Sequence, residues 1–442
     1  MRFPEFCLLV AVAGLAGFIQ AETVKDREGA VRNDQAAMAQ DSRWIYNDVV
    51  RGFREAKESG KPLLVVLRCV PCLACGGLDG RVIDRASDLG PLLDRFVCVR
   101  VINANTLDLT RFQFDFDLSF STLIFNGDGT LYARFGSWAH QKNAQDRSVD
   151  SFRQTLEGAL EVHQGYPANR ATLLGKQAPP VAYRTPIDLP TLTGKYRAEL
   201  DWQGKVVPSC VHCHQIGDAF RATFRERGEA IPAPWIFPQP PPETIGLKLV
   251  SGERARVEAV APDSIAARGG LRPGDELIRG AGQRILSQAD LSWVLHGAPE
   301  AGTVEWVIRR DGQEKVLTFE LPAGWRSRSD ISRRVGTWGM RAMALGGLKL
   351  VELTEAERQQ FGLSPQTLGL RAEHVGEYGQ HAVAKKAGFR KNDVIVEVEG
   401  QAQPRTEGQL IGDLLQRHRP GELIPVVVQR GSERVKLELL QQ

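Results

Sequence analysis

The chain has 442 residues, of which 42% are hydrophobic and 25% are charged, and its formal net charge at pH 7 is +3. A chain of this length exceeds what one ordinary core organises, so we expect three or four domains. The small net charge, with no basic block interleaved with aromatic residues, argues against nucleic acid as a partner.

The N-terminus has the pattern of a secretory signal. An early arginine precedes an apolar stretch from Cys7 to Ile19, and the small residue Ala21 follows it. This stretch is shorter than the roughly 20 residues that a transmembrane helix needs. We therefore expect residues 1–21 to be a signal peptide and the protein to be secreted, with the periplasm as its compartment. An uncleaved signal that anchors the chain is the alternative, and it is the only membrane contact we expect.

Residues 42–165 have the pattern of an α/β domain. The expected elements are a helix over 42–58, a buried strand over 63–67, a helix over 78–96, a buried strand over 97–102, a hairpin over 121–136 and a closing helix over 149–163. Apolar residues at helical spacing indicate the first helix, and the Asn-Gly pair between two β-prone runs indicates the hairpin. This order predicts a sheet covered by helices on both faces.

The cysteines are few and clustered. Without the signal, six remain: Cys69, Cys72, Cys75, Cys98, Cys210 and Cys213. This is too sparse for a disulfide scaffold, and five of the six lie in two tight clusters, which favours dedicated chemistry. Cys98 lies in an apolar strand pattern and is expected to be a buried core thiol.

The first cluster contains two overlapping C-x-x-C pairs within "GKPLLVVLRCVPCLACGGLD", residues 60–79. This stretch resembles the active-site region of periplasmic thioredoxin-fold domains, in which Lys-Pro, a buried strand and a short turn precede a C-x-x-C that opens a helix. Counted from Lys61-Pro62, the resemblance places Cys72 and Cys75 at the two active positions. The helix N-terminus would favour the Cys72 thiolate as nucleophile, and Cys75 would act as the resolving thiol.

Two features leave alternatives open for this cluster. Cys69 is an unusual third sulfur, and Ser121 stands where thioredoxins place a cis-proline that positions substrate and keeps metals away. A metal ion held by Cys69, Cys72 and Cys75 is one alternative to dithiol redox chemistry. A structural disulfide is the other.

The second cluster is a C-x-x-C-H motif formed by Cys210, Cys213 and His214. It resembles a cytochrome c attachment site, in which two thiols bind the haem vinyl groups and the histidine ligates iron. Haem c is therefore an expected cofactor, with His140, His163 or His212 as possible sixth ligands. The alternatives are a local disulfide or a zinc site that adds His212. The motif lies within residues 166–242, which end in a proline-rich spacer.

The C-terminal half contains an internal repeat. "IAARGGLRPGDELIRGAG" and "AVAKKAGFRKNDVIVEVEG" align Gly270 with Gly388 and Asp275 with Asp393, and Asn392 replaces Gly274 in a turn that favours left-handed backbone. The copies resemble the PDZ domains of HtrA-type periplasmic proteases over residues 243–323 and 334–441. In that family a loop before a strand binds a peptide's terminal carboxylate, and the peptide adds as an extra strand.

The resemblance assigns the two peptide-binding loops to residue triplets: Ile245, Gly246 and Leu247 in the first copy, and Trp338, Gly339 and Met340 in the second. One or both grooves could instead be blocked by neighbouring domains. The protease domain is absent and no G-x-S-x-G nucleophile motif occurs, so proteolysis is not expected.

The combination predicts a multidomain protein, α/β in its N-terminal part and mainly β in its C-terminal half. It resembles bacterial exported thioredoxin-fold/PDZ fusion proteins, a family that includes selenoproteins. The expected function is thiol–disulfide redox chemistry, with PDZ domains that recruit protein C-termini or extended peptides and a haem that handles electrons. A non-enzymatic PDZ scaffold and a metal-handling protein are the rival hypotheses.

Overall fold

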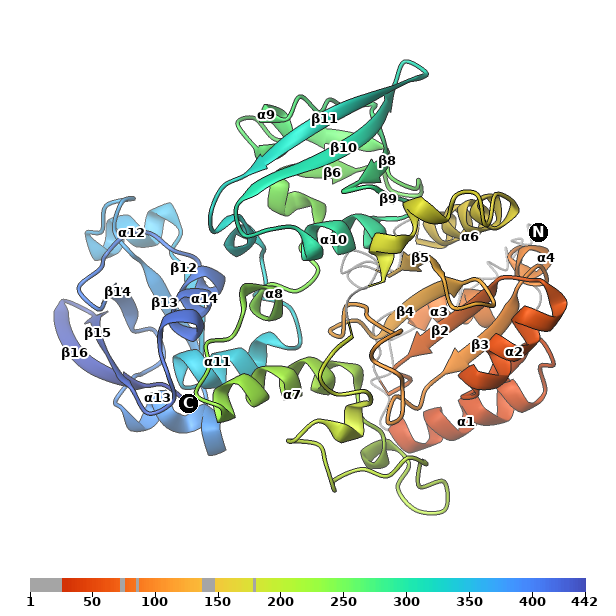
Figure 1. Cartoon of the computed structure of the whole chain (residues 1–442). Helices are drawn as coiled ribbons and strands as arrows, with labels where there is room; N and C mark the ends of the chain where they lie inside the picture. The colour runs from red at the N-terminus through yellow and green to blue at the C-terminus, as the bar shows by residue number, and fades with distance from the viewer. Residues whose placement is uncertain (1–25, 72–75, 85–86, 137–147, 178–179) are drawn as a thin grey trace, which may run out of the picture.

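The computed structural model describes residues 26–71, 76–84, 87–136, 148–177 and 180–442. Figure 1 shows an α/β lobe at the N-terminal end of the chain and two β-rich parts formed by its C-terminal half. We call these the first module (residues 247–321) and the second module (residues 348–440). The expected signal peptide lies outside the described residues. Within them, no helix has both the length and the apolar composition needed to cross a membrane.

The α/β lobe is built on a five-stranded mixed sheet with the order β1-β3-β2-β4-β5. Strands β1, β3 and β2 are parallel, and β4 and β5 extend the sheet in antiparallel fashion. The bounds are β1 (Trp44–Tyr46), β2 (Leu63–Arg68), β3 (Val97–Val101), β4 (Phe120–Phe125) and β5 (Leu131–Phe135). Every residue of β2 and β4 is buried, as expected for central strands that are covered on both faces.

Helices cover both faces of this sheet, as the order of elements predicts. They are α1 (Arg27–Ala39), α2 (Val49–Ser59), α3 (Gly76–Ile83), α4 (Gly90–Leu93) and α6 (Ser148–Gln164). Alternate residues of a strand point to opposite faces, so Leu63 and Val65 pack in the core beneath α2, whereas Leu64 and Val66 pack against α3, α4 and α6. The hairpin prediction is confirmed by the antiparallel pairing of β4 with β5.

Two expected helices differ from the structure. Residues 44–46 form the edge strand β1 instead of the start of a helix, because Asn47 adopts a left-handed backbone with φ of 57° and Asp48 caps α2 by accepting from the Arg51 N–H. The expected helix over 78–96 is divided into α3 and the short α4, which carries a proline in its first turn.

The segment between the α/β lobe and the first module packs against the α/β lobe at one end and against the second module at the other. It contains short 3₁₀ turns, α7 (Cys213–Glu226) and α8 (Ala233–Ile236). Leu200 and Val206 share a small core with Val31 and Ile102 of the α/β lobe. At its other end, Ile231, Ile236 and Phe237 lie in the core of the second module. The segment is therefore an extension of two domains and not a free spacer.

The two modules repeat one arrangement of elements. The first contains β6 (Leu247–Leu249), β7 (Val257–Val260), α9 (Ile265–Arg268), β8 (Glu276–Gly280), β9 (Gln283–Arg284), α10 (Gln288–Gly297), β10 (Gly302–Arg310) and β11 (Gln313–Leu321). The second contains β12 (Leu348–Glu352), α12 (Glu355–Phe361), β13 (Leu370–Val375), α13 (Val383–Lys386), β14 (Val394–Val398), α14 (Glu407–Arg417), β15 (Leu423–Arg430) and β16 (Glu433–Leu440). A further helix, α11 (Thr337–Leu345), precedes the second module.

Equivalent hydrogen bonds confirm the alignment of the two copies. Asp275 accepts two bonds from Arg310, and Asp393 accepts the same two from Arg430. Gly274 and Asn392 both have positive φ, at 89° and 70°, as the turn alignment predicts. The repeat is therefore structural as well as sequential.

Candidate functional site

Cys69 lies directly after β2, at the carboxyl end of the parallel strands. Its N–H donates to the carbonyl of Ser119 at 2.9 Å, and its own carbonyl accepts from Arg68 Nη1 at 2.6 Å. Cys72 and Cys75, the expected dithiol, lie outside the described residues, and α3 begins just after them. The first sulfur of the cluster is thus held at the end of the sheet where α/β proteins bind their ligands.

A buried charge network surrounds this end of β2. Asp79 of α3 accepts from Arg68 Nε at 3.0 Å and from two nitrogens of Arg100 at 2.7 and 2.9 Å. Asp34 of α1 accepts from Arg100 Nη2 at 2.6 Å. Burial raises the pKa of Asp79, but the hydrogen bonds and charges of Arg100 and Arg68 outweigh it and lower that pKa below its ordinary value. The network therefore holds an ionised carboxylate that joins α3 to β2 and β3.

The C-x-x-C-H segment packs against the same end of the sheet. Cys210 Sγ lies 3.3 Å from the carbonyl oxygen of Ile102, the residue that follows β3. The Val211 N–H donates to Asn105 Oδ1 at 2.7 Å. His212 Nδ1 lies 3.2 Å from Cys69 Sγ, although the two residues are 143 positions apart in the chain. Folding therefore brings Cys69 and the C-x-x-C-H segment to one place.

A cavity of about 20 Å³ lies between Cys69 and the C-x-x-C-H segment. Cys69, Cys210, His212 and Cys213 contribute to its wall, which is otherwise apolar except for Arg68. This volume holds about one water molecule, whereas pockets for drug-sized ligands measure roughly 300–1,000 Å³. As packed here, the described residues do not fit a haem between the two thiols. Haem attachment stays a prediction from the motif, which an absorption spectrum after expression with a cytochrome c maturation system would test.

His214, the expected iron ligand, lies in the first turn of α7 and faces a carboxylate. Its Nδ1 is 3.4 Å from Asp218 Oδ2, and Asp218 also accepts from Arg221 Nη2 at 2.7 Å. Burial raises the pKa of Asp218, but the bonds from His214 and Arg221 lower it below its ordinary value overall. His212 and His214 thus have different partners, one a thiol and the other a carboxylate.

The remaining histidines proposed as iron ligands have other contacts or cannot be placed. His163 bonds to the Tyr132 hydroxyl at 3.1 Å and to the Gly60 carbonyl at 2.9 Å. His140 lies outside the described residues. Across the described ranges, no group of three or more His, Cys, Asp or Glu side chains could hold a metal ion. The expected metal site includes Cys72 and Cys75 and so is not tested.

Two further sequence predictions concern the sheet. Ser121, at the position expected for the cis-proline, lies in β4 opposite Leu67 of β2. It is buried, and among the described residues its hydroxyl has no hydrogen-bond partner. Cys98 is buried in β3, as predicted, and burial raises the pKa of its thiol to about 12. A thiol with that pKa is protonated at neutral pH and does not act as a nucleophile.

The expected peptide-binding loop of the first module lies before its first strand. Ile245 ends a 3₁₀ turn, Gly246 has φ of 79°, and Leu247 begins β6. Close to this loop, α10 is buried against the α/β lobe: the Asp290 carboxylate pairs with Lys176 Nζ at 2.7 Å, and the Arg134 guanidinium stacks 3.7 Å from the Trp293 ring centre. The first module is thus fixed to the α/β lobe through its long helix.

In the second module the expected loop was assigned to the wrong residues. Trp338, Gly339 and Met340 lie inside α11, where helical hydrogen bonds use their backbone groups. The Ala261 N–H bonds to the Gly246 carbonyl in the first module, and in the second the Gly376 N–H bonds in the same way to the Gly347 carbonyl.

Gly346, Gly347 and Leu348 are therefore the residues of the second module equivalent to Ile245, Gly246 and Leu247. A signal in the sequence could have located them, because "GLKLV" occurs twice, at residues 246–250 and 347–351.

Comparisons with known proteins find a matching family and several similar proteins. Residues 44–127 match a family described as thioredoxin-like. Curated relatives named probable periplasmic serine endoprotease DegP-like include those of Pseudomonas savastanoi pv. phaseolicola, 28% identical over 160 residues, and Pseudomonas fluorescens, 30% identical over 161 residues. Each match covers 36% of this chain and 32% of the relative, so the chain spans about a third of the length of these relatives.

Solved structures that resemble the chain include the HtrA-type protease AlgW with a tripeptide, at 18% identity, covering 31% of this chain and 52% of that chain, with a TM-score of 0.20. The same protease with a decapeptide matches at 18% identity, covering 31% of this chain and 48% of that chain, also with a TM-score of 0.20. The chain thus contains a thioredoxin-like domain and has DegP-like relatives.

Proposed function

We propose that the protein is an exported thiol–disulfide redox protein of the periplasm whose two modules act as PDZ domains. The observation that carries the proposal is the contact between His212 and Cys69 at 3.2 Å. It places the C-x-x-C-H segment at the end of β2, next to the position from which Cys72 and Cys75 follow. The thioredoxin-like match over residues 44–127, with Cys69 at this end of the sheet, supports redox chemistry.

The proposed reaction is thiol–disulfide exchange. The Cys72 thiolate attacks one sulfur of a substrate disulfide, which forms a mixed disulfide and releases the other substrate sulfur as a thiolate. Cys75 then attacks the Cys72 sulfur and releases the second substrate thiol. The substrate disulfide is reduced by two electrons, Cys72 and Cys75 become a disulfide, and the reverse sequence oxidises a substrate dithiol.

The proposed partners are proteins with an accessible C-terminus or extended segment. Such a segment would add as a strand beside β6 or β12, with its carboxylate at the loop that contains Gly246 or Gly347. The periplasmic names of the DegP-like relatives support the compartment. Their endoprotease activity is not part of the proposal, because the chain matches a third of their length.

The test is disulfide reduction in the full mature chain, followed by the turbidity of reduced insulin with dithiothreitol as electron donor. We expect Cys72→Ser to abolish the activity. Cys98→Ser is the matched control, because Cys98 is buried in β3 and its pKa is raised to about 12. Unchanged activity in Cys72→Ser would refute the redox proposal.

A non-enzymatic PDZ scaffold is the second candidate function. Ser121 favours it, because its buried hydroxyl stands where thioredoxins carry the proline that positions substrate. A scaffold would bind peptides while showing no cysteine-dependent reduction of insulin. The same assay therefore separates the two candidates.

A further inference from the structure

The second module has a strand edge that could accept a peptide. Its sheet has the order β12-β13-β14-β15-β16, so β12 is an edge strand with one side unpaired by other strands. The loop of Gly346 and Gly347 leads directly into β12, and α14 packs against it. A peptide bound as in PDZ domains would lie between β12 and α14.

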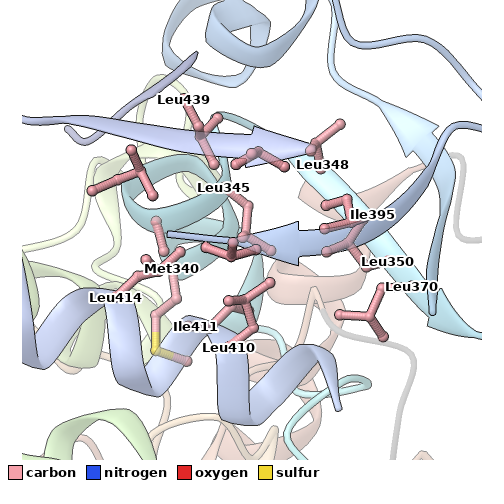
Figure 2. Close-up of a cluster of buried hydrophobic side chains, with 14 of the residues drawn as sticks. Met340, Leu345, Leu348, Leu350, Leu370, Ile395, Leu410, Ile411, Leu414 and Leu439 are labelled. Carbon is pink, nitrogen blue, oxygen red and sulfur yellow. The ribbon is translucent and has the colours of Figure 1, made fainter. Parts of the chain in front are cut away.

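Helix α11 packs against both α14 and β12, the two walls of this position. Its residues Met340, Ala344 and Leu345 are at most 1% exposed and belong to the same core as side chains of both walls of the groove. Figure 2 shows Met340 beside the α14 residues Ile411 and Leu414, with Leu348 and Leu350 of β12 nearby. An apolar peptide side chain would need the space that α11 fills.

A backbone N–H group on the unpaired edge of β12 already has a hydrogen-bond acceptor within the chain. The Leu350 N–H donates to Glu407 Oε1 at 2.7 Å, so a carboxylate of α14 takes the place of a peptide carbonyl. Arg341 of α11 holds that carboxylate by donating to both of its oxygens, at 2.9 and 2.6 Å. The Arg341 and Glu407 side chains are only 2% and 4% exposed, so removal of either one would leave the other as a buried charge without its partner.

Contacts before and within α11 connect it to the α/β lobe and to the last residue of the chain. Just before the helix, Arg334 Nε donates to Asp117 Oδ2 at 2.9 Å, and Gly336 N–H donates to Asp117 Oδ1 at 3.0 Å. Asp117 lies three residues before β4. Within the helix, the Met343 carbonyl accepts from the Gln442 N–H at 3.0 Å. Movement of α11 would therefore disturb the loop that leads into β4 of the α/β lobe.

We propose that α11 is an internal ligand of the peptide groove in the second module. A protein C-terminus with an apolar last residue must displace α11 to bind, and displacement breaks the Arg341–Glu407 pair and frees the Leu350 N–H. The inference rests on the proposed peptide recruitment. It adds that recruitment by this module is gated and is coupled through Arg334 to the α/β lobe.

The first test is hydrogen exchange of the full mature chain without any peptide. In Arg341→Ala we expect amides of residues 337–345 to exchange at least tenfold faster than in the wild type, while amides of α14 stay within about twofold. Glu407→Gln keeps the side chain's size and weakens the pairing, so it should shift exchange in the same direction. Arg371→Ala is the control. Arg371 lies in β13, and its Nε is 3.3 Å from Oε1 of Glu357 in α12, so it forms its ion pair away from α11.

If α11 and α14 lose protection together, or if neither changes, α11 is a fixed part of the core and the inference is wrong.

The second test measures binding of fluorescein-labelled decapeptide pools, each with a free carboxylate and one apolar C-terminal residue, beside amidated pools. We expect Arg341→Ala to bind at least one carboxylate pool at least tenfold more tightly than the wild type and Arg371→Ala, because the competing helix no longer holds the groove.

Equal affinities would overturn the inference. Absence of binding to every pool by all three proteins would refute peptide recruitment by this module, and the inference with it. The insulin assay would be unaffected by that result, so the two failures can be told apart.

Discussion

The ion pair between Asp290 and Lys176 joins the first module to the α/β lobe, and its disruption gives the sharpest stability prediction. The two side chains are 2% and 1% exposed, with Asp290 Oδ2 and Lys176 Nζ 2.7 Å apart. Asp290 also accepts from the N–H groups of Leu286 and Arg134, each at 3.1 Å. Asp290→Asn preserves the shape of the side chain but leaves Lys176 as a buried cation without its partner.

Removal of one partner from a buried pair costs about 3–5 kcal/mol. Burial already lowers the pKa of Lys176 to about 8. Without Asp290 the amine can release its proton at neutral pH, which limits the penalty, so we expect a loss of about 3 kcal/mol. Urea unfolding at pH 7, followed by tryptophan fluorescence and far-UV circular dichroism, measures it.

A double variant and an exposed pair serve as controls for this prediction. Asp290→Asn combined with Lys176→Met should recover at least half of the lost stability, because the buried amine without its partner is then removed as well. Glu258→Gln removes an exposed partner of Lys248 in the same module and should cost less than about 1 kcal/mol. A cost below about 1 kcal/mol for Asp290→Asn would show that the first module is not docked as described.

Two further predictions concern pH and backbone strain. Burial lowers the pKa of His296 to about 3, so between about pH 6.5 and 3 the unfolded chain binds a proton that the folded chain does not. The free energy of unfolding should therefore fall as the pH drops through this range. In urea titrations His296→Gln should make this fall with pH shallower, and an unchanged pH dependence would contradict the prediction. Gly347→Ala should destabilise the protein by about 2 kcal/mol or more in thermal unfolding, because φ is 92° and the new Cβ would lie 2.0 Å from the His381 carbonyl oxygen. Gly362→Ala, with φ of 65° and no atom within 4 Å, should cost only about 1 kcal/mol, and equal losses would refute the steric argument.

Local patterns in the sequence were sufficient for much of the fold. The buried strands, the hairpin after Phe120 and the repeat around Asp275 and Asp393 depend on side-chain periodicity and turn chemistry, which act over a few residues. They were predicted correctly for this reason. The edge strand β1 was missed because a three-residue strand carries too little periodicity to distinguish it from the helix that follows.

The features that depend on packing between distant segments could not be predicted. The contact between Cys69 and His212 joins residues 143 positions apart, and no local pattern encodes it. Helix α11 was missed for the same reason: its apolar residues fit equally well with a loop before a strand until α14 and β12 are in place. The position of the loop could have been predicted, because "GLKLV" occurs once in each module.

The share of Ile231, Ile236 and Phe237 in the core of the second module has a consequence for the order of folding. Synthesis from the N-terminus produces these residues long before α14, where Gly412 leaves the space that the Phe237 ring fills. Until α14 is present, these three large apolar side chains lack the core residues against which they pack in the folded protein. Truncated or stalled chains that end within the second module should therefore be the species most prone to aggregate and most attractive to chaperones.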